Sequence, residues 1–279
     1  MAARLLAAVL AGLLLAGPLA AQSTLLQIRP RVGDTLRMRL DQQVEMSGVT
    51  RVGDVDSTVT VTTRTRVLAH SVVEKSDAEG TTMLAITDSV IVSSAKGDRP
   101  ILAEQARPGL QGQRVQLRVA PDGGTQVMGG DELAPELRAA FAQMPAMLPR
   151  TPVAVGESWT RKMALPGGGG GGGAPGRAAR GGALVAVFRL DSLTRNGELA
   201  HVSLRGSLAR DGAPDEFPHG LSFAMTGAVI GTMVVDRRRG WMTDARTTLT
   251  VLSTVAPRPG TGARPMKVRM KVTQWLRAM

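Results

Sequence analysis

The chain has no cysteine and no tyrosine, and these absences exclude several kinds of protein. Without cysteine there can be no disulfide framework, no thiolate metal site and no cysteine nucleophile. Aromatic residues make up only 3% of the 279 residues, whereas proteins that bind single-stranded nucleic acid usually stack bases on aromatic side chains. We therefore expect no nucleic-acid partner, although the formal charge is +11.

The first residues have the layout of an export signal. An apolar run from Leu5 to Ala16 follows one arginine and ends before Pro18 and the small residues Ala20 and Ala21. A retained membrane anchor would need about 20 apolar residues, more than this run contains. We expect residues 1–21 to be a cleaved signal peptide, which places the protein in the periplasm or outside the cell.

Alternation of apolar and polar residues dominates the rest of the chain. From Leu36 to Met46, for example, the even positions are mostly apolar and the odd positions are polar. A period of two indicates a strand with one buried face. Ten segments are candidate strands: 36–46, 59–67, 82–92, 114–119, 157–165, 184–193, 199–209, 221–235, 241–251 and 267–272.

Turn signals separate several of these strands: Glu79-Gly80, Asp122-Gly123-Gly124, Asn196-Gly197 and Arg239-Gly240. Asn-Gly favours a two-residue hairpin turn, so we expect 184–193 to pair antiparallel with 199–209. The uncharged stretch Phe217–Val235 has to be tested as a membrane span, but its proline and glycines oppose a helix. We predict a buried strand there.

Helix signals are few. Apolar residues at helical spacing predict a helix over Leu133–Met144, which Pro145 would end. A further helical turn is expected over Ile101–Ala106. Seven consecutive glycines, Gly167–Gly173, predict a disordered loop over 166–183, because such a segment has high chain entropy and nothing to bury. The loop lacks the Gly-Lys-Ser/Thr ending of a phosphate-binding loop.

The imbalance between strands and helices predicts the fold. A helix of about 12 residues is about 18 Å long and cannot cover ten apolar strand faces. The strands must cover one another by curling or by forming a sandwich. We expect a single mainly β domain over 22–279: a curved antiparallel sheet, a half-barrel or barrel of about ten strands, with one short helix packed on it. A curled sheet of this size leaves room inside.

No constellation in the sequence predicts catalysis. The three histidines, His70, His201 and His219, lack metal-ligand spacing. Ser93 and Lys96 match a Ser-x-x-Lys motif, but they close a predicted strand and the partner motifs of such acyl enzymes are missing. We expect no metal, no cofactor, no catalytic residue and no enzymatic activity.

Two short phrases echo one another. Val32–Leu36 and Val155–Trp159 share the order Val, Gly, acid, hydroxyl, large apolar residue, and each opens a predicted strand. Duplicated halves would produce such an echo, and so would chance over five positions.

Three features carry a resemblance to a known family: the turn Ala120–Gly124, the helix from Leu133 and the phrase Pro152–Trp159. Together they resemble an uncharacterised family of secreted bacterial β-rich domains, for which no activity is assigned. The resemblance implies an architecture similar to periplasmic lipoprotein carriers, a curved half-barrel with a helical plug. The polyglycine segment departs from this pattern.

Two functions follow from these expectations. The first is an exported non-enzymatic domain that binds an apolar ligand, a lipid or a lipidated partner on the concave side of the sheet, where Met side chains adapt to irregular ligands. Its candidate lining residues are Trp159, Phe188, Phe223, Met225, Trp241 and Leu249; simple core packing is the competing interpretation of each.

The alternative is a structural or assembly protein of the cell envelope whose basic face meets an anionic surface. Lys267, Arg269 and Lys271 share the polar phase of the last strand, and Arg237–Arg239 cluster in one turn. The competing interpretation is a solvated face that discourages edge pairing.

Overall fold

The computed structural model describes residues 23–52, 55–129, 146–164, 183–212, 222–256 and 265–279. These residues form twelve strands and one short 3-10 helix, η1 (Pro108–Leu110). The strands are β1 (Thr35–Val52), β2 (Val55–Ser76), β3 (Thr81–Lys96), β4 (Arg99–Ala106), β5 (Arg114–Val119), β6 (Thr125–Gly129), β7 (Ser158–Ala164), β8 (Ala183–Thr194), β9 (Leu199–Gly212), β10 (Ser222–Asp236), β11 (Trp241–Ala256) and β12 (Met266–Ala278).

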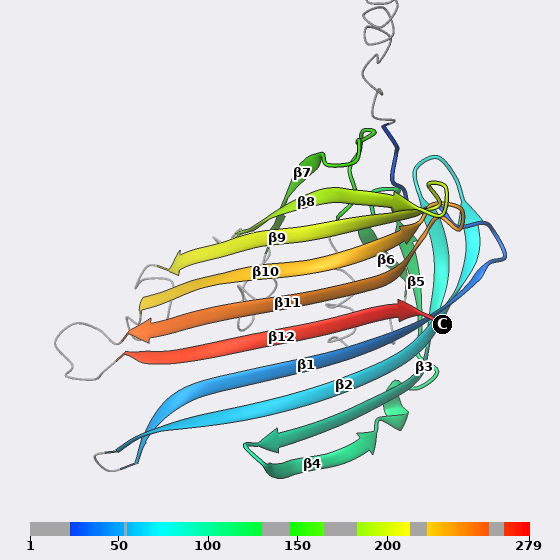
Figure 1. Ribbon diagram of the computed structural model, residues 1–279. Helices are drawn as coiled ribbons and strands as arrows, with labels where there is room; N and C mark the ends of the chain where they lie inside the picture. Colours follow the sequence, from blue (N-terminus) through cyan, green and yellow to red (C-terminus); the bar gives the residue numbers. More distant parts are fainter. Residues whose placement is uncertain (1–22, 53–54, 130–145, 165–182, 213–221, 257–264) are drawn as a thin grey trace, which may run out of the picture.

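All twelve strands belong to one antiparallel sheet (Figure 1). The order is β6-β5-β3-β2-β1-β12-β11-β10-β9-β8-β7, and β4 pairs with the far end of β3. The first and last strands are therefore neighbours, with β1 and β12 in register from Met38–Ala278 to Gly48–Val268. In the described part of the chain the sheet is not closed, because β6 and β7 end the path of paired strands.

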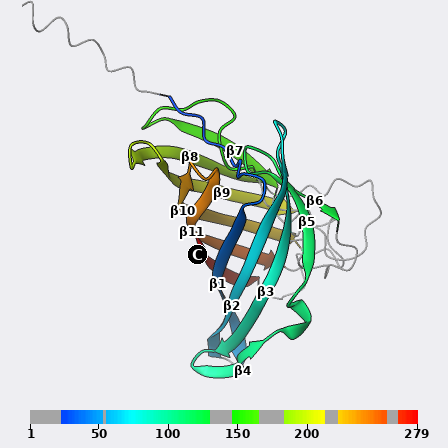
Figure 2. The same cartoon turned by 90° about the vertical axis from the view of Figure 1, so that its right-hand side faces the viewer.

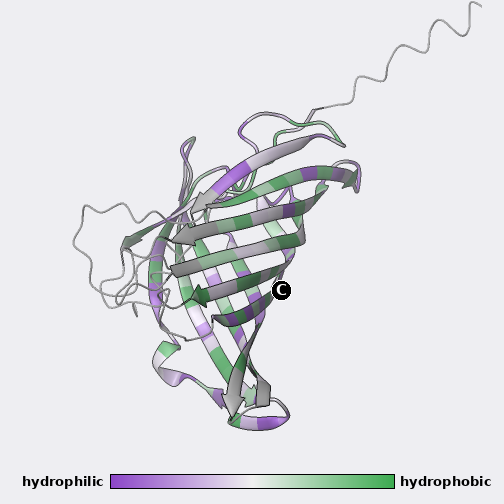
Figure 3. Cartoon of the chain, turned by 90° about the vertical axis from the view of Figure 1, so that its left-hand side faces the viewer, coloured by the Kyte–Doolittle hydropathy of each residue, from purple (hydrophilic) through white to green (hydrophobic). Residues whose placement is uncertain are grey.

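The alternating sequence pattern sets the two faces of the sheet (Figure 3). Along β12, the even positions from Val268 to Leu276 are half-buried, whereas Lys267, Arg269 and Lys271 are exposed. We call the face that carries the buried apolar residues the inner face and the opposite one the outer face. Each of the ten predicted segments coincides with an observed strand, so the prediction from alternation is confirmed; residue 157 precedes β7, and residues 165 and 221 lie outside the described part of the chain.

The sheet curls on itself, as Figure 2 shows. Met83 and Leu117, on β3 and β5, share one hydrophobic core with Phe188, Val202 and Met233, on β8 to β10. Four strands separate β3 from β10 in the sheet, and a flat sheet could not bring these side chains together. The expectation that the strands cover one another is therefore confirmed.

We call β3, β5 and β6 one wall of the curled sheet and β7 to β10 the other wall. Residues 24–30 run between these two walls. Thr24 forms an isolated antiparallel bridge with Val153. The Ile28 N–H donates to the carbonyl of Pro121 at 2.8 Å, and the Arg29 N–H donates to the carbonyl of Gly240 at 2.7 Å. We call residues 24–30 the strap, because they connect the β5–β6 turn to the β10–β11 turn.

Several turns agree with their sequence signals and one differs in detail. β8 and β9 pair antiparallel as expected. Their connection has four residues, 195–198, and not two, with positive φ at Arg195 (51°), Asn196 (57°) and Gly197 (88°). The stretch proposed above to be a strand and not a membrane span contributes β10.

The helical turn predicted over Ile101–Ala106 is wrong, because these residues belong to β4 and complete the edge of β3. The short strand β6 was not predicted. The predicted helix Leu133–Met144, the signal peptide over 1–21 and residues 166–182 of the glycine-rich loop lie outside the described residues. Within the described part, no helix has the length and apolar character to span a membrane.

Candidate functional site

One half of the inner face extends beyond the core, which it meets at Val229 and Leu249. There the side chains of β1, β12, β11 and β10 line up in cross-strand rows. The first row is Val44, Val272, Leu249 and Val229; the second is Met46, Met270, Val251 and Gly227; the third is Gly48, Val268, Ser253 and Met225. We call these three rows the apolar rows.

Most residues of the apolar rows are neither fully buried nor fully exposed to solvent. Val44, Met270 and Val272 are half-buried, and Met46 is 48% exposed. The rows span four residue-to-residue steps along each strand and three gaps between strands, which is an area of about 14 Å by about 14 Å. A contiguous apolar area left partly open is the kind of surface that binds apolar ligands or partners.

The predicted lining residues divide into two groups. Trp159 stacks on Phe188 with ring centroids 5.7 Å apart, and its Nε1–H donates to the Met147 carbonyl at 2.8 Å. Phe188 is fully buried, so this pair belongs to the core. Trp241 also packs on the core, with its Nε1 3.4 Å from the Met38 sulfur.

Two of the other predicted residues, Leu249 and Met225, lie in the apolar rows, and Leu249 also packs against the core. Leu249 stands opposite Val272, and Met225 stands opposite Ser253. Phe223 belongs to β10, but its side chain lies outside what the structure describes. Sequence reasoning missed the contribution of β1, whose Val44 and Met46 have the right alternation. Only the pairing of β1 with β12 joins them to the rest.

A polar row crosses the inner face on β1, β12 and β11, next to the apolar rows. Gln42, Gln274 and Thr247 stand side by side on β1, β12 and β11, all half-buried. The Thr247 hydroxyl lies 3.5 Å from the Gln274 side-chain oxygen. These groups offer hydrogen-bond donors and acceptors next to an apolar surface, as ligand sites commonly do.

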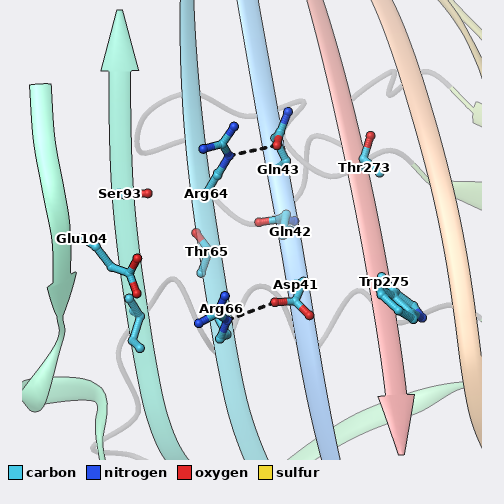
Figure 4. A pocket seen from close by; sticks show the side chains of 11 residues that line it. Asp41, Gln42, Gln43, Arg64, Thr65, Arg66, Ser93, Glu104, Thr273 and Trp275 are labelled. Carbon is cyan, nitrogen blue, oxygen red and sulfur yellow. Dashed lines mark hydrogen bonds and ion pairs between the residues drawn. The ribbon is translucent and has the colours of Figure 1, made fainter. Parts of the chain in front are cut away.

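The outer face carries a different feature, a polar hollow of about 450 Å³ where β1, β2, β3, β4 and β12 adjoin (Figure 4). Among its lining residues are Asp41, Arg64, Arg66, Glu104 and Trp275. The Arg64 Nε–H donates to the side-chain oxygen of Gln43 at 3.1 Å. Acids and arginines are balanced among these residues, and the hollow was not predicted from the sequence.

Asp41 is the centre of the charges beside this hollow. The Arg39 guanidinium donates two hydrogen bonds to its carboxylate, at 2.7 and 2.9 Å. Arg66 lies 3.2 Å away and Arg277 3.4 Å away. The hydrogen bonds from Arg39, aided by Arg66, hold the pKa of Asp41 below its ordinary value. The arginines are thus held in place around one anion.

Trp275 stands next to this cluster. Its Nε1–H donates to Asp244 at 2.8 Å. The guanidinium groups of Arg246 and Arg277 lie over the indole ring, 4.1 and 3.9 Å from its centroid. Cation–π contacts of this kind stabilise the arrangement, and they occupy the aromatic ring that a planar ligand would need.

Among the described residues, those considered for catalysis are not assembled into a site; His219 lies outside the described part of the chain. Ser93 and Lys96 are three positions apart in β3, so their side chains leave opposite faces of the sheet. His70 contacts Asp88 at 2.7 Å, and His201 contacts the Thr194 hydroxyl at 2.9 Å. The residues that the structure describes contain no group of acids and histidines that could hold a metal ion.

Comparison with known proteins gives a likeness of fold. No family model matches the chain, and no curated protein sequence matches it. A solved structure described as lipid–protein interactions in lipovitellin matches with a TM-score of 0.50 at 9% identity, covering 89% of this chain and 25% of that one. The chain thus spans about a quarter of that protein.

A second solved structure, DynF from the dynemicin biosynthesis pathway of Micromonospora chersina, matches with a TM-score of 0.21 at 7% identity, covering 92% of this chain and 86% of that one. This score is too low to support an argument about the fold.

Proposed function

We propose that the protein binds a lipid or another apolar ligand against the inner face of its curved sheet and catalyses no reaction. The observation that carries the proposal is the set of apolar rows, in which Met46 is exposed, Val229 and Val251 are buried and the other Met, Val and Leu side chains are half-buried. The lipovitellin structure, described as one of lipid–protein interactions, supports it through the similar fold.

Burial of the hydrocarbon part of a ligand supplies enough free energy for binding to this surface. Each methylene group removed from water contributes about 0.8 kcal/mol, so ten buried methylenes contribute about 8 kcal/mol. That corresponds to a dissociation constant of about 1 μM before the cost of association is subtracted. The adjacent polar row of Gln42, Gln274 and Thr247 would face the polar end of an amphipathic ligand.

A direct test is native mass spectrometry of the full chain purified without detergent, before and after extraction with organic solvent. We expect an added mass that extraction removes, and a lipid in the extract. Only the mass of the polypeptide in both spectra, with no lipid extracted, would contradict the proposal. That result would instead favour a structural protein of the envelope whose interior is fully packed.

The pleat of β12 offers a matched pair of variants. Met270→Glu places a charge among the apolar rows and should abolish the added mass, because a carboxylate is costly to bury against a hydrocarbon chain. Thr273→Glu places the same charge on the exposed outer face of the same strand and should leave the added mass unchanged. Retention of the ligand by Met270→Glu would show that the ligand binds elsewhere on the protein.

We also propose that the protein acts outside the cytoplasm, as the pattern of residues 1–21 indicates, and that it belongs with the secreted β-rich domains it resembles. N-terminal sequencing of the protein recovered from the periplasm or the medium should give a chain that starts at Gln22. An intact N-terminus in the cytoplasmic fraction would contradict this location.

A further inference from the structure

The cations in the first half of β12 differ from the arginines around Asp41 on the same outer face. Lys267, Arg269 and Lys271 are exposed, and within the part of the chain that the structure describes none of them forms an ion pair. By contrast, Arg39 and Arg277 are held by Asp41. The first group therefore has no carboxylate partner among the described residues, while the second is held by one.

Exposed apolar side chains lie beside these cations. Leu252 on β11 pairs directly with Arg269 and is 46% exposed. Val49 on β1 follows the last β1–β12 pair, Gly48–Val268, and is 49% exposed. We call Lys267, Arg269, Lys271, Leu252 and Val49 the basic patch. Glu45, opposite Lys271, accepts a hydrogen bond from Gln43 at 2.6 Å.

We propose that the basic patch docks the protein on the surface of an anionic phospholipid bilayer. Unpaired lysines and arginines near such a surface each contribute about 1 kcal/mol of attraction. Side chains such as Leu252 and Val49 gain free energy only from a partner that has an apolar layer beneath its charges. A bilayer provides both, whereas a nucleic acid provides the charge alone.

Docking of this patch has a geometric consequence for the inner face. The same segment of β12 that presents Lys267, Arg269 and Lys271 outwards presents Val268 and Met270 inwards. The basic patch and the apolar rows are thus the two faces of one end of the sheet. A protein docked there holds its apolar rows next to the membrane. The docking itself does not depend on whether these rows bind a ligand.

The test is cosedimentation of the full chain with vesicles of phosphatidylglycerol and phosphatidylcholine in equal amounts, and with vesicles of phosphatidylcholine alone. We expect binding to the anionic vesicles only, and its loss at high salt, because added salt shortens the screening length. The variant Lys267→Glu/Arg269→Glu/Lys271→Glu should bind at least about 100-fold more weakly, three charges at about 1 kcal/mol each being worth that factor.

A control variant distinguishes the effect of the basic patch on vesicle binding from the effect of the net charge of the protein. Arg99→Glu/Arg107→Glu/Arg114→Glu makes the same change in charge at three exposed positions of β4, β5 and the segment between them. It should keep most of the binding. Equal loss in both variants would mean that net charge alone attracts the protein and would overturn the proposal.

Three other results would also overturn it: undiminished binding by the patch variant, equal binding to neutral vesicles, and patch-dependent binding to a DNA duplex without binding to vesicles. Should the glutamate variant fail to fold by circular dichroism, Lys267→Gln/Arg269→Gln/Lys271→Gln replaces it, with a loss of about 100-fold expected from the three charges removed. Because vesicles and not a resident ligand are the probe, failure here is distinct from failure of the proposed lipid site.

Discussion

Asp41 takes its partners from three neighbouring strands. Arg39 lies on β1, Arg66 on β2 and Arg277 on β12, and all of them lie within 3.4 Å of its carboxylate. A single carboxylate therefore keeps several like charges together at the centre of the sheet. The acid is only partly exposed, at 29%, so these contacts are less screened than fully exposed pairs.

The lowered pKa of Asp41 predicts a dependence of stability on pH. A depressed pKa in the folded state stabilises the protein above the pKa of the unfolded state, about 3.9, and this stabilisation is lost as the pH falls through the folded value. We expect Asp41→Asn to lower the free energy of unfolding by about 1 kcal/mol at neutral pH. The difference should shrink below about pH 4, as urea unfolding at several pH values would show.

Asp191→Asn is the control for this prediction. Asp191 lies on the outer face of β8 and accepts one hydrogen bond from Ser203, with Arg189 3.9 Å away. Its replacement should change the free energy of unfolding by less than about 0.5 kcal/mol. A difference for Asp41→Asn that stays constant from neutral to acidic pH would show that charge is not the cause.

At the scale of elements, the echo between Val32–Leu36 and Val155–Trp159 has a structural counterpart. In each phrase the glycine has a positive φ, 88° at Gly33 and 91° at Gly156. In each, the acid side chain accepts a hydrogen bond from the N–H three residues earlier: Arg31 to Asp34 at 3.0 Å, and Ala154 to Glu157 at 2.7 Å. The phrases are one strand-opening motif used twice, in front of β1 and β7.

The turn Ala120–Gly124, another feature of the family resemblance, also has a structural role, while the segment from Leu133 to Met144 lies outside the described residues. Within the turn Ala120–Gly124, the buried Asp122 binds Arg150 at 3.0 Å, and its carbonyl accepts hydrogen bonds from Met147 and Leu148. Arg161 of β7 donates to the Leu148 carbonyl. These residues fasten the segment before β7 to the β5–β6 turn.

The strap meets the β10–β11 turn at Gly240. This glycine has a φ of 63°, and a Cβ there would overlap the backbone of Arg29. Gly240→Ala therefore forces the strap and the turn apart and also strains φ. We expect it to lower the free energy of unfolding by at least about 2 kcal/mol, measured by chemical denaturation.

Gly97→Ala provides the comparison, since Gly97 has a φ of 55° but no atom lies within 4 Å of a Cβ there. It should cost about 1 kcal/mol from the strain of φ alone. Equal losses in the two variants would show that the contact between Gly240 and the strap contributes nothing.

The elements that the sequence predicted are those with long alternation. In the segment Leu36–Met46 the even positions are half-buried from Leu36 to Val44, and the segment lies within β1. β4 lacks such a pattern, because nearly all of Arg99–Ala106 is exposed on both faces. Its apolar run at Ile101–Ala106 was therefore open to a helical interpretation. Only pairing with β3, a tertiary contact, makes it a strand.

At the scale of the whole molecule, the decisive contacts are those farthest apart in sequence. Alternation predicted that the strands cover one another's apolar faces, and it predicted which residues of each strand lie on its apolar face. It could not predict that β1 pairs with β12, because register between distant strands is not written in local periodicity. For this reason the predicted lining residues included the core pair Trp159 and Phe188, while Val44 and Met46 were missed.

The strap makes the two walls one cooperative unit. Leu26 is fully buried in the core that β5 and β8 share, whereas its neighbour Leu25 is 38% exposed. Leu26→Ala should lower the free energy of unfolding by about 3 kcal/mol, and Leu25→Ala by less than about 0.5 kcal/mol. Both should keep a single transition in urea, because neither wall has a core of its own. Equal effects at the two positions, or a second transition in Leu26→Ala, would mean that each wall folds without the strap between them.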